Sequence, residues 1–242
     1  LTALVAIPSV REKSEEGKSY GVESARALDC ILAMAESMGL KTKNVDGYAG
    51  HAEYGEGGEI AAVLAHVDVV PVGEGWDSDP FTVTKRGSLY FGRGTADDKG
   101  AAVVALYCLK ALKDEGVLGK RRLRAIFGAG EETGMDDLEH YFETEPLPQM
   151  AFTPDAEYGV CNREKGILHF NILGPGASEI VEYLEAGTVV NAVPDHAEAK
   201  IICTEEHFQA LQKAAENSGG QFELEKTPDG ANIVSHGKAA HA

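Results

Sequence analysis

The stretch EIAAVLAHVD, residues 59–68, decides the fold class. Its first seven residues are almost all apolar, without polar alternation, which is typical of a central strand covered on both faces. The run ends in His66 and Asp68, which point to the same side if the chain is still extended. Imidazole is the commonest metal ligand, and a nearby carboxylate can fix its tautomer. Taken alone, however, a histidine at a strand end is more often a satisfied polar residue.

Helices and strands alternate on both sides of this stretch over the first 160 residues. The order predicts an α/β fold with a mostly parallel central sheet flanked by helices. After about residue 163 the order is nearer α+β, so we expect two domains, 1–162 and 163–242. The elements expected from apolar periodicity are the helices 23–40, 98–116 and 205–220 and the strands 59–65, 121–130 and 150–155.

Composition limits the partners of the chain. It has 242 residues, 22 Lys plus Arg and 39 Asp plus Glu, for a net charge of −17. This excess would repel phosphate backbones and anionic lipids, so we expect neither nucleic acid nor membrane as a partner. No apolar segment approaches the roughly 20 residues that span a bilayer, and LTALVAIPSVREK lacks the features of a signal peptide. The four cysteines suggest neither a zinc knuckle nor a disulfide framework. We therefore expect a cytoplasmic protein.

A pair of aspartates lies where a glycine-rich turn enters a predicted helix. The segment GRGTADDKG, residues 92–100, contains Asp97 and Asp98. Helix capping is the alternative explanation, since an aspartate at a helix start accepts amide hydrogens and suits the dipole. That explanation is strong for one carboxylate and weaker for two. Lys99 in the first turn also opposes the dipole, so the segment is not optimised for capping alone.

Two more acidic clusters follow predicted strands. GAGEETG, residues 128–134, carries Glu131 and Glu132 in tandem, and TPDAEYG, residues 153–159, adds Asp155. A solvated acidic loop and a Pro-Asp turn are the plain alternatives, and each is sufficient for its own cluster. In a parallel sheet, however, ligands bind outside the carboxyl ends of the strands. We therefore expect these clusters to converge on one crevice with the histidine of the central strand.

The expected set of one histidine and several carboxylates favours metal-assisted hydrolysis. Such ligands suit zinc or a related divalent ion, and a shared aspartate allows two ions about 3.5–4 Å apart. The chain has no G-x-S-x-G elbow for a serine hydrolase. The glycine-rich segment also lacks the spacing of a phosphate-binding loop.

Four motifs in order, HVDVVPVGEGWDSDPF, LYFGRGTADDKG, GAGEETG and TPDAEYGVCNREKG, carry a family resemblance. They resemble the dinuclear-zinc metallopeptidases that include acetylornithine deacetylase, succinyl-diaminopimelate desuccinylase, carboxypeptidase G and carnosinases. VDGYAGHAEYGEG, TPDAEYG and NREKG are most similar to the PepV-type dipeptidases, which cleave Xaa-His or β-alanyl dipeptides. The resemblance implies a zinc-binding catalytic domain, part of an inserted α+β lid domain, a small peptide substrate, and a monomer or a lid-mediated homodimer.

The resemblance also implies the metal ligands. His66 and Asp155 would hold one zinc ion, Asp97 would bridge two ions, and Glu132 would help to hold the second. Mn²⁺ or Co²⁺ could replace Zn²⁺. In relatives the peptide bond after the bridging aspartate is cis, so we expect a cis bond before Asp98.

Further roles are implied by the same likeness. Glu131 would be the general base, and Asp68 would orient the histidine ligand. In the lid, Asn191 would contact substrate and His241 would donate to the developing oxyanion. A turn asparagine and an exposed histidine are the plain alternatives for these last two residues.

The second zinc ion of relatives takes a further histidine far downstream, after the lid. If the chain ends at Ala242, that site is incomplete and a substrate-binding arginine is also missing. Three interpretations therefore stay open: a dipeptidase, an N-acyl amino acid deacylase, and an inactive metal-binding fragment.

Overall fold

The computed structural model describes residues 1–73, 75–156, 159–163, 166, 168, 170–173, 179–187, 192–238 and 240–241. The chain divides into two compact units, Leu1–Gly159 and Val160–Ala242, and each is described by itself. The predicted roles of 1–162 as a catalytic domain and of 163–242 as part of a lid stay predictions.

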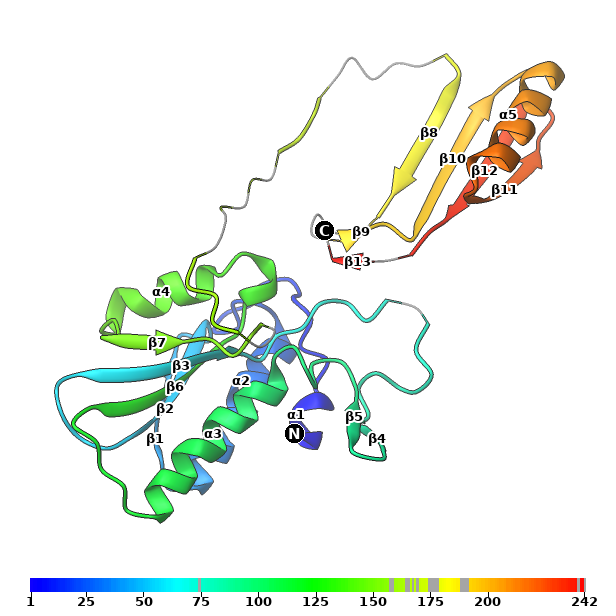
Figure 1. The fold of residues 1–242 in the computed structure, drawn as a ribbon. Coiled ribbons are helices and arrows are strands. Elements are labelled where there is room, and N and C mark those ends of the chain that lie inside the picture. The colour runs from blue at the N-terminus through cyan, green and yellow to red at the C-terminus, as the bar shows by residue number, and fades with distance from the viewer. Residues whose placement is uncertain are drawn as a thin grey trace. The chain divides into compact units, whose positions relative to one another are not determined.

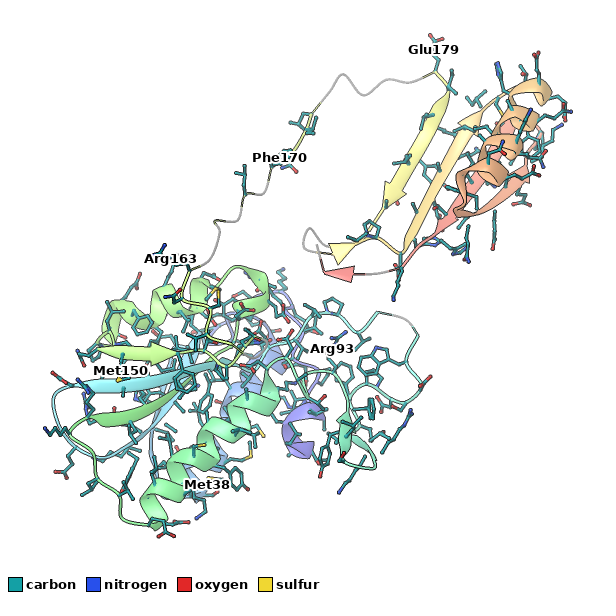
Figure 2. The ribbon with its side chains drawn as sticks, in the orientation of Figure 1. Met38, Arg93, Met150, Arg163, Phe170 and Glu179 are labelled. Atoms are coloured by element: carbon teal, nitrogen blue, oxygen red, sulfur yellow. The ribbon has the colours of Figure 1, made fainter. Side chains whose placement is uncertain are left out.

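A five-stranded mixed sheet forms the centre of the first unit (Figure 1). Its strand order is β1-β2-β6-β3-β7. Strands β3, β6 and β7 pair in parallel, whereas β1 and β2 join through antiparallel ladders. The bounds are β1 Lys41–Val45, β2 Ala49–Tyr54, β3 Ile60–His66, β6 Arg122–Gly128 and β7 Met150–Phe152. β7 is an edge strand, and Met150 at its start is exposed (Figure 2).

Helices cover both faces of this sheet. On one face α2, Val22–Ser37, and α3, Lys99–Asp114, bury apolar stripes that include Leu28 and Leu106. On the other face α4, Asp136–Thr144, buries Tyr141 against Ile126 of β6. The burial of apolar area on both faces explains why β3 has no polar side chain before His66.

Short elements complete the first unit. They are α1 Thr2–Val5, the β4–β5 hairpin formed by Thr84–Arg86 and Leu89–Phe91, and the 3₁₀ helix η1 Glu131–Thr133. Helix α2 ends next to Gly39, whose φ of 72° lies in the left-handed region, as is common after a helix C-terminus.

The second unit contains a four-stranded antiparallel sheet in the order β11-β12-β10-β8, with α5 beside it (Figure 1). Phe208 is the buried residue of α5. A separate two-stranded sheet pairs β9 with β13. The bounds are β8 Val181–Ala186, β9 Ala192–Val193, β10 His196–Ile202, α5 Glu205–Ser218, β11 Gln221–Lys226, β12 Gly230–His236 and β13 Ala240–His241.

The predicted α/β class is confirmed, and the expected strands 59–65, 121–130 and 150–155 and helices 23–40 and 98–116 correspond to β3, β6, β7, α2 and α3. The sequence pattern does not predict β1 and β2, because their residues KTKNV and AGHAEY lack an apolar run. These two strands add the antiparallel pairs and make the sheet mixed. Among the described residues, no helix combines the length and the apolar character needed to cross a bilayer.

Candidate metal centre

The ligand candidates lie at the carboxyl ends of three neighbouring strands. His66 is the last residue of β3, Glu131 opens η1 just after β6, and Asp155 comes after β7. Asp97 precedes α3 and reaches the same point from the side of the helix. The expected convergence of the acidic segments is therefore found.

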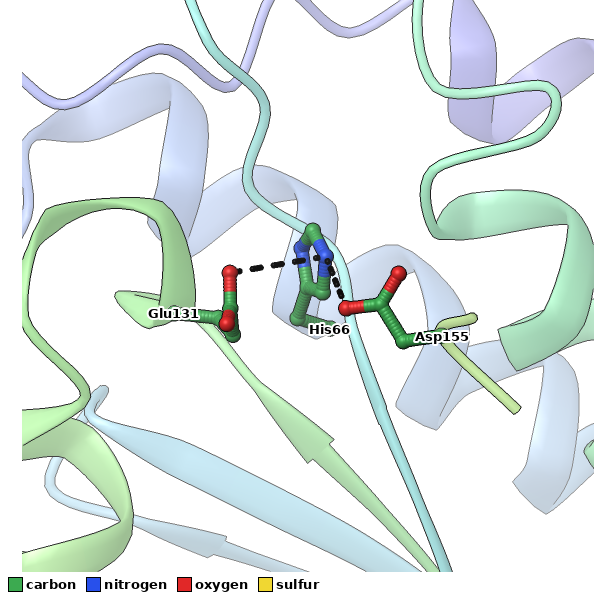
Figure 3. A group of neighbouring side chains, drawn as sticks. All are labelled: His66, Glu131 and Asp155. Carbon is green, nitrogen blue, oxygen red and sulfur yellow. Dashed lines mark ion pairs between the residues drawn. The ribbon is translucent and has the colours of Figure 1, made fainter. Parts of the chain in front are cut away.

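Carboxylates surround Nε2 of His66. It lies 3.0 Å from Oδ1 of Asp97, 3.4 Å from Oδ2 of Asp155 and 3.8 Å from Oε2 of Glu131. In Figure 3, Glu131 and Asp155 approach the ring from opposite sides. The histidine side chain is only 3% exposed, so these contacts occur where water screens charge weakly.

Two groups of three potential ligands share this imidazole. In each group the ligand atoms lie within 4.8 Å of one another: His66, Glu131 and Asp155 in one, His66, Asp97 and Glu132 in the other. We call the four carboxylates Asp97, Glu131, Glu132 and Asp155 the acidic cluster. Together with the imidazole they offer the oxygen and nitrogen atoms that bind divalent cations such as zinc.

Asp68 supports the cluster from the other side of the histidine ring. Nδ1 of His66 lies 3.1 Å from the Asp68 carbonyl oxygen and 3.3 Å from its Oδ1. The same carboxylate accepts backbone hydrogen bonds from Glu131 at 3.3 Å and from Glu132 at 3.1 Å. From the sequence, Asp68 is expected only to contact His66. The link to the tandem glutamates depends on the loop after β6, which the sequence does not reveal.

Asp98 does not act as a helix cap. It occupies the N-cap position of α3, yet its side chain makes no capping hydrogen bond. Instead its Oδ2 accepts the backbone N–H of His66 at 3.4 Å, and the side chain is fully buried. Its Oδ1 is buried without a hydrogen-bond partner among the described residues. The peptide bond between Asp97 and Asp98 is cis, as expected.

The concentration of negative charge shifts the ionisation of the cluster. Burial, and then the nearby Asp97 carboxylate, raise the pKa of Glu132 to about 7. Burial also raises the pKa of Glu131. For His66, burial lowers the pKa, but hydrogen bonds to three neighbouring carboxylates outweigh burial and raise it far above its ordinary value. The site therefore favours positive charge at its centre, whether a proton or a cation supplies it.

Asp137, a carboxylate that the sequence does not single out, supports the loop after β6. Asp137 is buried and accepts the backbone N–H of Gly130 at 2.9 Å. Burial raises the pKa of Asp137 to about 6. Its position in GMDDLEH, directly after the GAGEETG segment, is the signal that could have indicated it.

Two predicted residues of the second unit lack a described side chain. Asn191 lies outside the described residues. For His241 only the backbone is described, as the partner of Ala192 in the β9–β13 pair. Their predicted roles toward substrate stay predictions.

A family model described as Peptidase family M20/M25/M40 matches residues 62–237, which include every member of the acidic cluster. The chain belongs to this peptidase family. Curated relatives agree with this. "Putative dipeptidase YtjP" of Bacillus subtilis (strain 168) is 43% identical over 191 residues, covering 76% of this chain and 41% of that protein. "Putative dipeptidase SH1171" of Staphylococcus haemolyticus (strain JCSC1435) is 37% identical, covering 100% of this chain and 54% of that protein.

A similar fold is found among solved structures. Human carnosine dipeptidase 1 is similar with a TM-score of 0.56 and 15% identity, over 97% of this chain and 67% of that chain. At this identity the likeness concerns the fold. The chain spans about half the length of the two curated M20 relatives.

Proposed function

We propose that this chain carries the catalytic centre of a metal-dependent hydrolase that cleaves the amide bond of dipeptides. One observation carries the proposal: four carboxylates from three separate loops meet around one buried imidazole, in two groups of three potential ligands. Acidic loops that only face solvent repel one another, so nothing would bring their carboxylates to one point. A centre that gathers so much negative charge is best explained by bound cations.

The donor set fits a pair of zinc ions. In the proposal His66 and Asp155 hold one ion, Asp97 bridges, and Glu132 helps to hold the other. Mn²⁺ or Co²⁺ would also suit these ligands. Oδ1 of Asp98, the residue after the proposed bridging aspartate, is buried and has no hydrogen-bond partner among the described residues. When bound, the ions would polarise the scissile carbonyl and lower the pKa of the attacking water.

Glu131 is the proposed general base. Its Oε2 lies 3.8 Å from Nε2 of His66, so it borders the same centre, and its side chain is 34% exposed. It can therefore reach an incoming water while the imidazole stays buried. The raised pKa of Glu131 suits a group that takes a proton from water and returns it to the leaving amine.

The substrate class is supported by the relatives. Both curated proteins have dipeptidase in their names, and the family match includes the whole acidic cluster. Because the chain spans only about half of their length, activity and substrate stay proposals. A cytoplasmic location and a monomer or lid-mediated homodimer stay predictions.

Metal analysis combined with hydrolysis assays tests the proposal. The purified protein, freed of metal and then loaded with Zn²⁺, is assayed on a dipeptide panel beside acetylornithine and succinyl-diaminopimelate. We expect bound zinc and metal-dependent cleavage of dipeptides. Cleavage of the N-acyl substrates alone would identify a deacylase and overturn the dipeptide proposal. Bound zinc without hydrolysis of any of them would favour the inactive metal-binding fragment.

A further inference from the structure

We propose that residues 7–11, here called the N-terminal strap, position three segments of the site: the loop after β3 beside His66, the segment with Asp97, and the loop with Glu131 and Glu132. The inference goes beyond the proposed function and rests on it only for the role of those loops. The strap contributes no ligand. It contacts each loop through a different residue, and the three residues alternate along the strap: Ile7, Ser9 and Arg11.

Ser9 holds the loop after β3. Its hydroxyl donates to the carbonyl of Val67 at 2.6 Å, and its own carbonyl accepts the N–H of Val69 at 3.0 Å. Both contacts flank Asp68, whose carboxylate faces His66. Ser9 is fully buried, so loss of its hydroxyl would leave a buried carbonyl without this donor.

Ile7 holds the segment that carries Asp97. Nζ of Lys99 donates to the Ile7 carbonyl at 2.7 Å, and Lys99 is fully buried. This contact explains a lysine in the first turn of α3, where its charge opposes the helix dipole. Because Lys99 lies two residues after Asp97, the contact fixes the entry of the chain into the helix beside the proposed bridging residue.

Arg11 holds the loop that carries the tandem glutamates. Its Nη1 donates to Oγ1 of Thr133 at 2.8 Å and to the Thr133 carbonyl at 3.1 Å. Thr133 is the last residue of η1, which begins with Glu131 and Glu132. The guanidinium also lies 5.0 Å from the ring centroid of Tyr20, which limits the orientations that Arg11 can adopt.

The three contacts make one short segment the common support of separate loops. A loop after a strand has few backbone hydrogen bonds of its own and opens at low free energy. Ligands must also keep their geometry to within about 0.5 Å to bind a cation well. Tethering all three loops to the same segment links their positions. A substitution of Ser9 or Arg11 should therefore increase the mobility of these loops, although neither residue is a proposed metal ligand.

Hydrogen exchange of the backbone amides tests the strap without requiring a bound metal. The variants are Ser9→Ala and Arg11→Ala, and the matched controls are Ser14→Ala and Lys13→Ala at exposed neighbours. We expect exchange in segments 67–69 and 131–133 to become about tenfold faster in the strap variants, since one lost hydrogen bond weakens protection by roughly that factor. Exchange in β1 and β2 should stay unchanged. Arg11→Lys, which keeps a donor, should restore most of the protection.

Cobalt binding gives a second readout that separates this inference from the proposed function. We expect the visible spectrum of the Co²⁺-loaded protein to change in Ser9→Ala and Arg11→Ala and to stay the same in both controls. The proposed role of the strap would be wrong if exchange in the strap variants matched that in the controls. It would also be wrong if exchange became faster by the same factor across the whole first unit. If the unsubstituted protein binds no Co²⁺, Zn²⁺ or Mn²⁺, the proposed function fails, while exchange still decides the strap. Arg11 is exposed, so its variant remains informative if Ser9→Ala does not fold.

Discussion

Oδ1 of Asp68 lies 3.3 Å from Nδ1 of His66, and both side chains are almost fully buried. The same carboxylate accepts the backbone N–H groups of Glu131 and Glu132. One side chain thus contacts the proposed histidine ligand and supports the loop of the proposed base. Ligand orientation and base position therefore depend on a single buried charge.

Replacing that charge should weaken metal binding. Asp68→Asn keeps the size of the side chain but removes its negative charge, and the amide nitrogen cannot accept one of the two backbone N–H groups that the carboxylate accepts. We expect zinc affinity, measured by competition with a chelator, to fall about 10–100-fold. Asp77→Asn, at a side chain that is 81% exposed, is the control. Equal zinc affinities of Asp68→Asn and Asp77→Asn would contradict the supporting role of Asp68.

The proposed base should be separable from the ligands. Glu131→Gln removes the proton acceptor and preserves the shape of the side chain. We expect turnover to fall about a hundred- to ten-thousand-fold while bound zinc per chain is retained. Glu143→Gln, at an exposed site on α4, should leave both quantities unchanged. Retained turnover in Glu131→Gln would eliminate Glu131 as the base.

Metal removal should lower stability. A cation that binds the folded state relieves repulsion within the acidic cluster, and at a free concentration 100 times Kd it adds about 2.7 kcal/mol. We expect the Tm of metal-free protein to rise when Zn²⁺ is added. The rise should be much smaller in Asp155→Asn than in Asp46→Asn, whose side chain is 73% exposed. A similar rise in both would show that zinc binds elsewhere.

Acid should destabilise the first unit through His51. Burial, and then the charge of Arg124, lower the pKa of His51 to about 4, and its Nδ1 lies 2.7 Å from the Tyr141 hydroxyl. Between about pH 6.5 and pH 4 the unfolded chain therefore binds more protons than the folded one. The contribution of neutral His51 to stability is fully present above about pH 6.5 and is lost as the pH falls toward 4, by up to about 3 kcal/mol.

Urea unfolding of His51→Gln measures this effect. The stability of the wild type relative to His51→Gln should decrease as the pH is lowered from 7 to 4. The exposed control His207→Gln should track the wild type across this range. A constant difference between wild type and His51→Gln would show that His51 does not titrate as argued.

The sequence predicted the strands and helices that deliver the cluster because their burial leaves a clear apolar signature. β3 is apolar up to His66 and β6 is apolar after Arg124, and the polar residues that follow these runs are conspicuous. β2 is not predicted because its sequence contains polar residues, which are buried against polar partners on other elements. Glu53 accepts from Arg124, and His51 contacts Tyr141, so each polar group is satisfied by a partner distant in sequence.

The supports of the site could not be predicted for a similar reason. Ser9 and Arg11 donate to the backbone carbonyls of Val67 and Thr133, which lie 58 and 122 residues further along the chain. Every residue has a backbone carbonyl, so the type of the accepting residue does not reveal such a hydrogen bond. Only the three-dimensional placement of the loops indicates these contacts.

Every side chain of the acidic cluster, together with His66 and Asp68, comes from residues 66–155, inside the unit Leu1–Gly159. A recombination event with its crossover after Gly159 would thus transfer the entire cluster intact and exchange only the downstream residues. Evolution or an engineer could diversify the downstream residues by shuffling without rebuilding the acidic cluster.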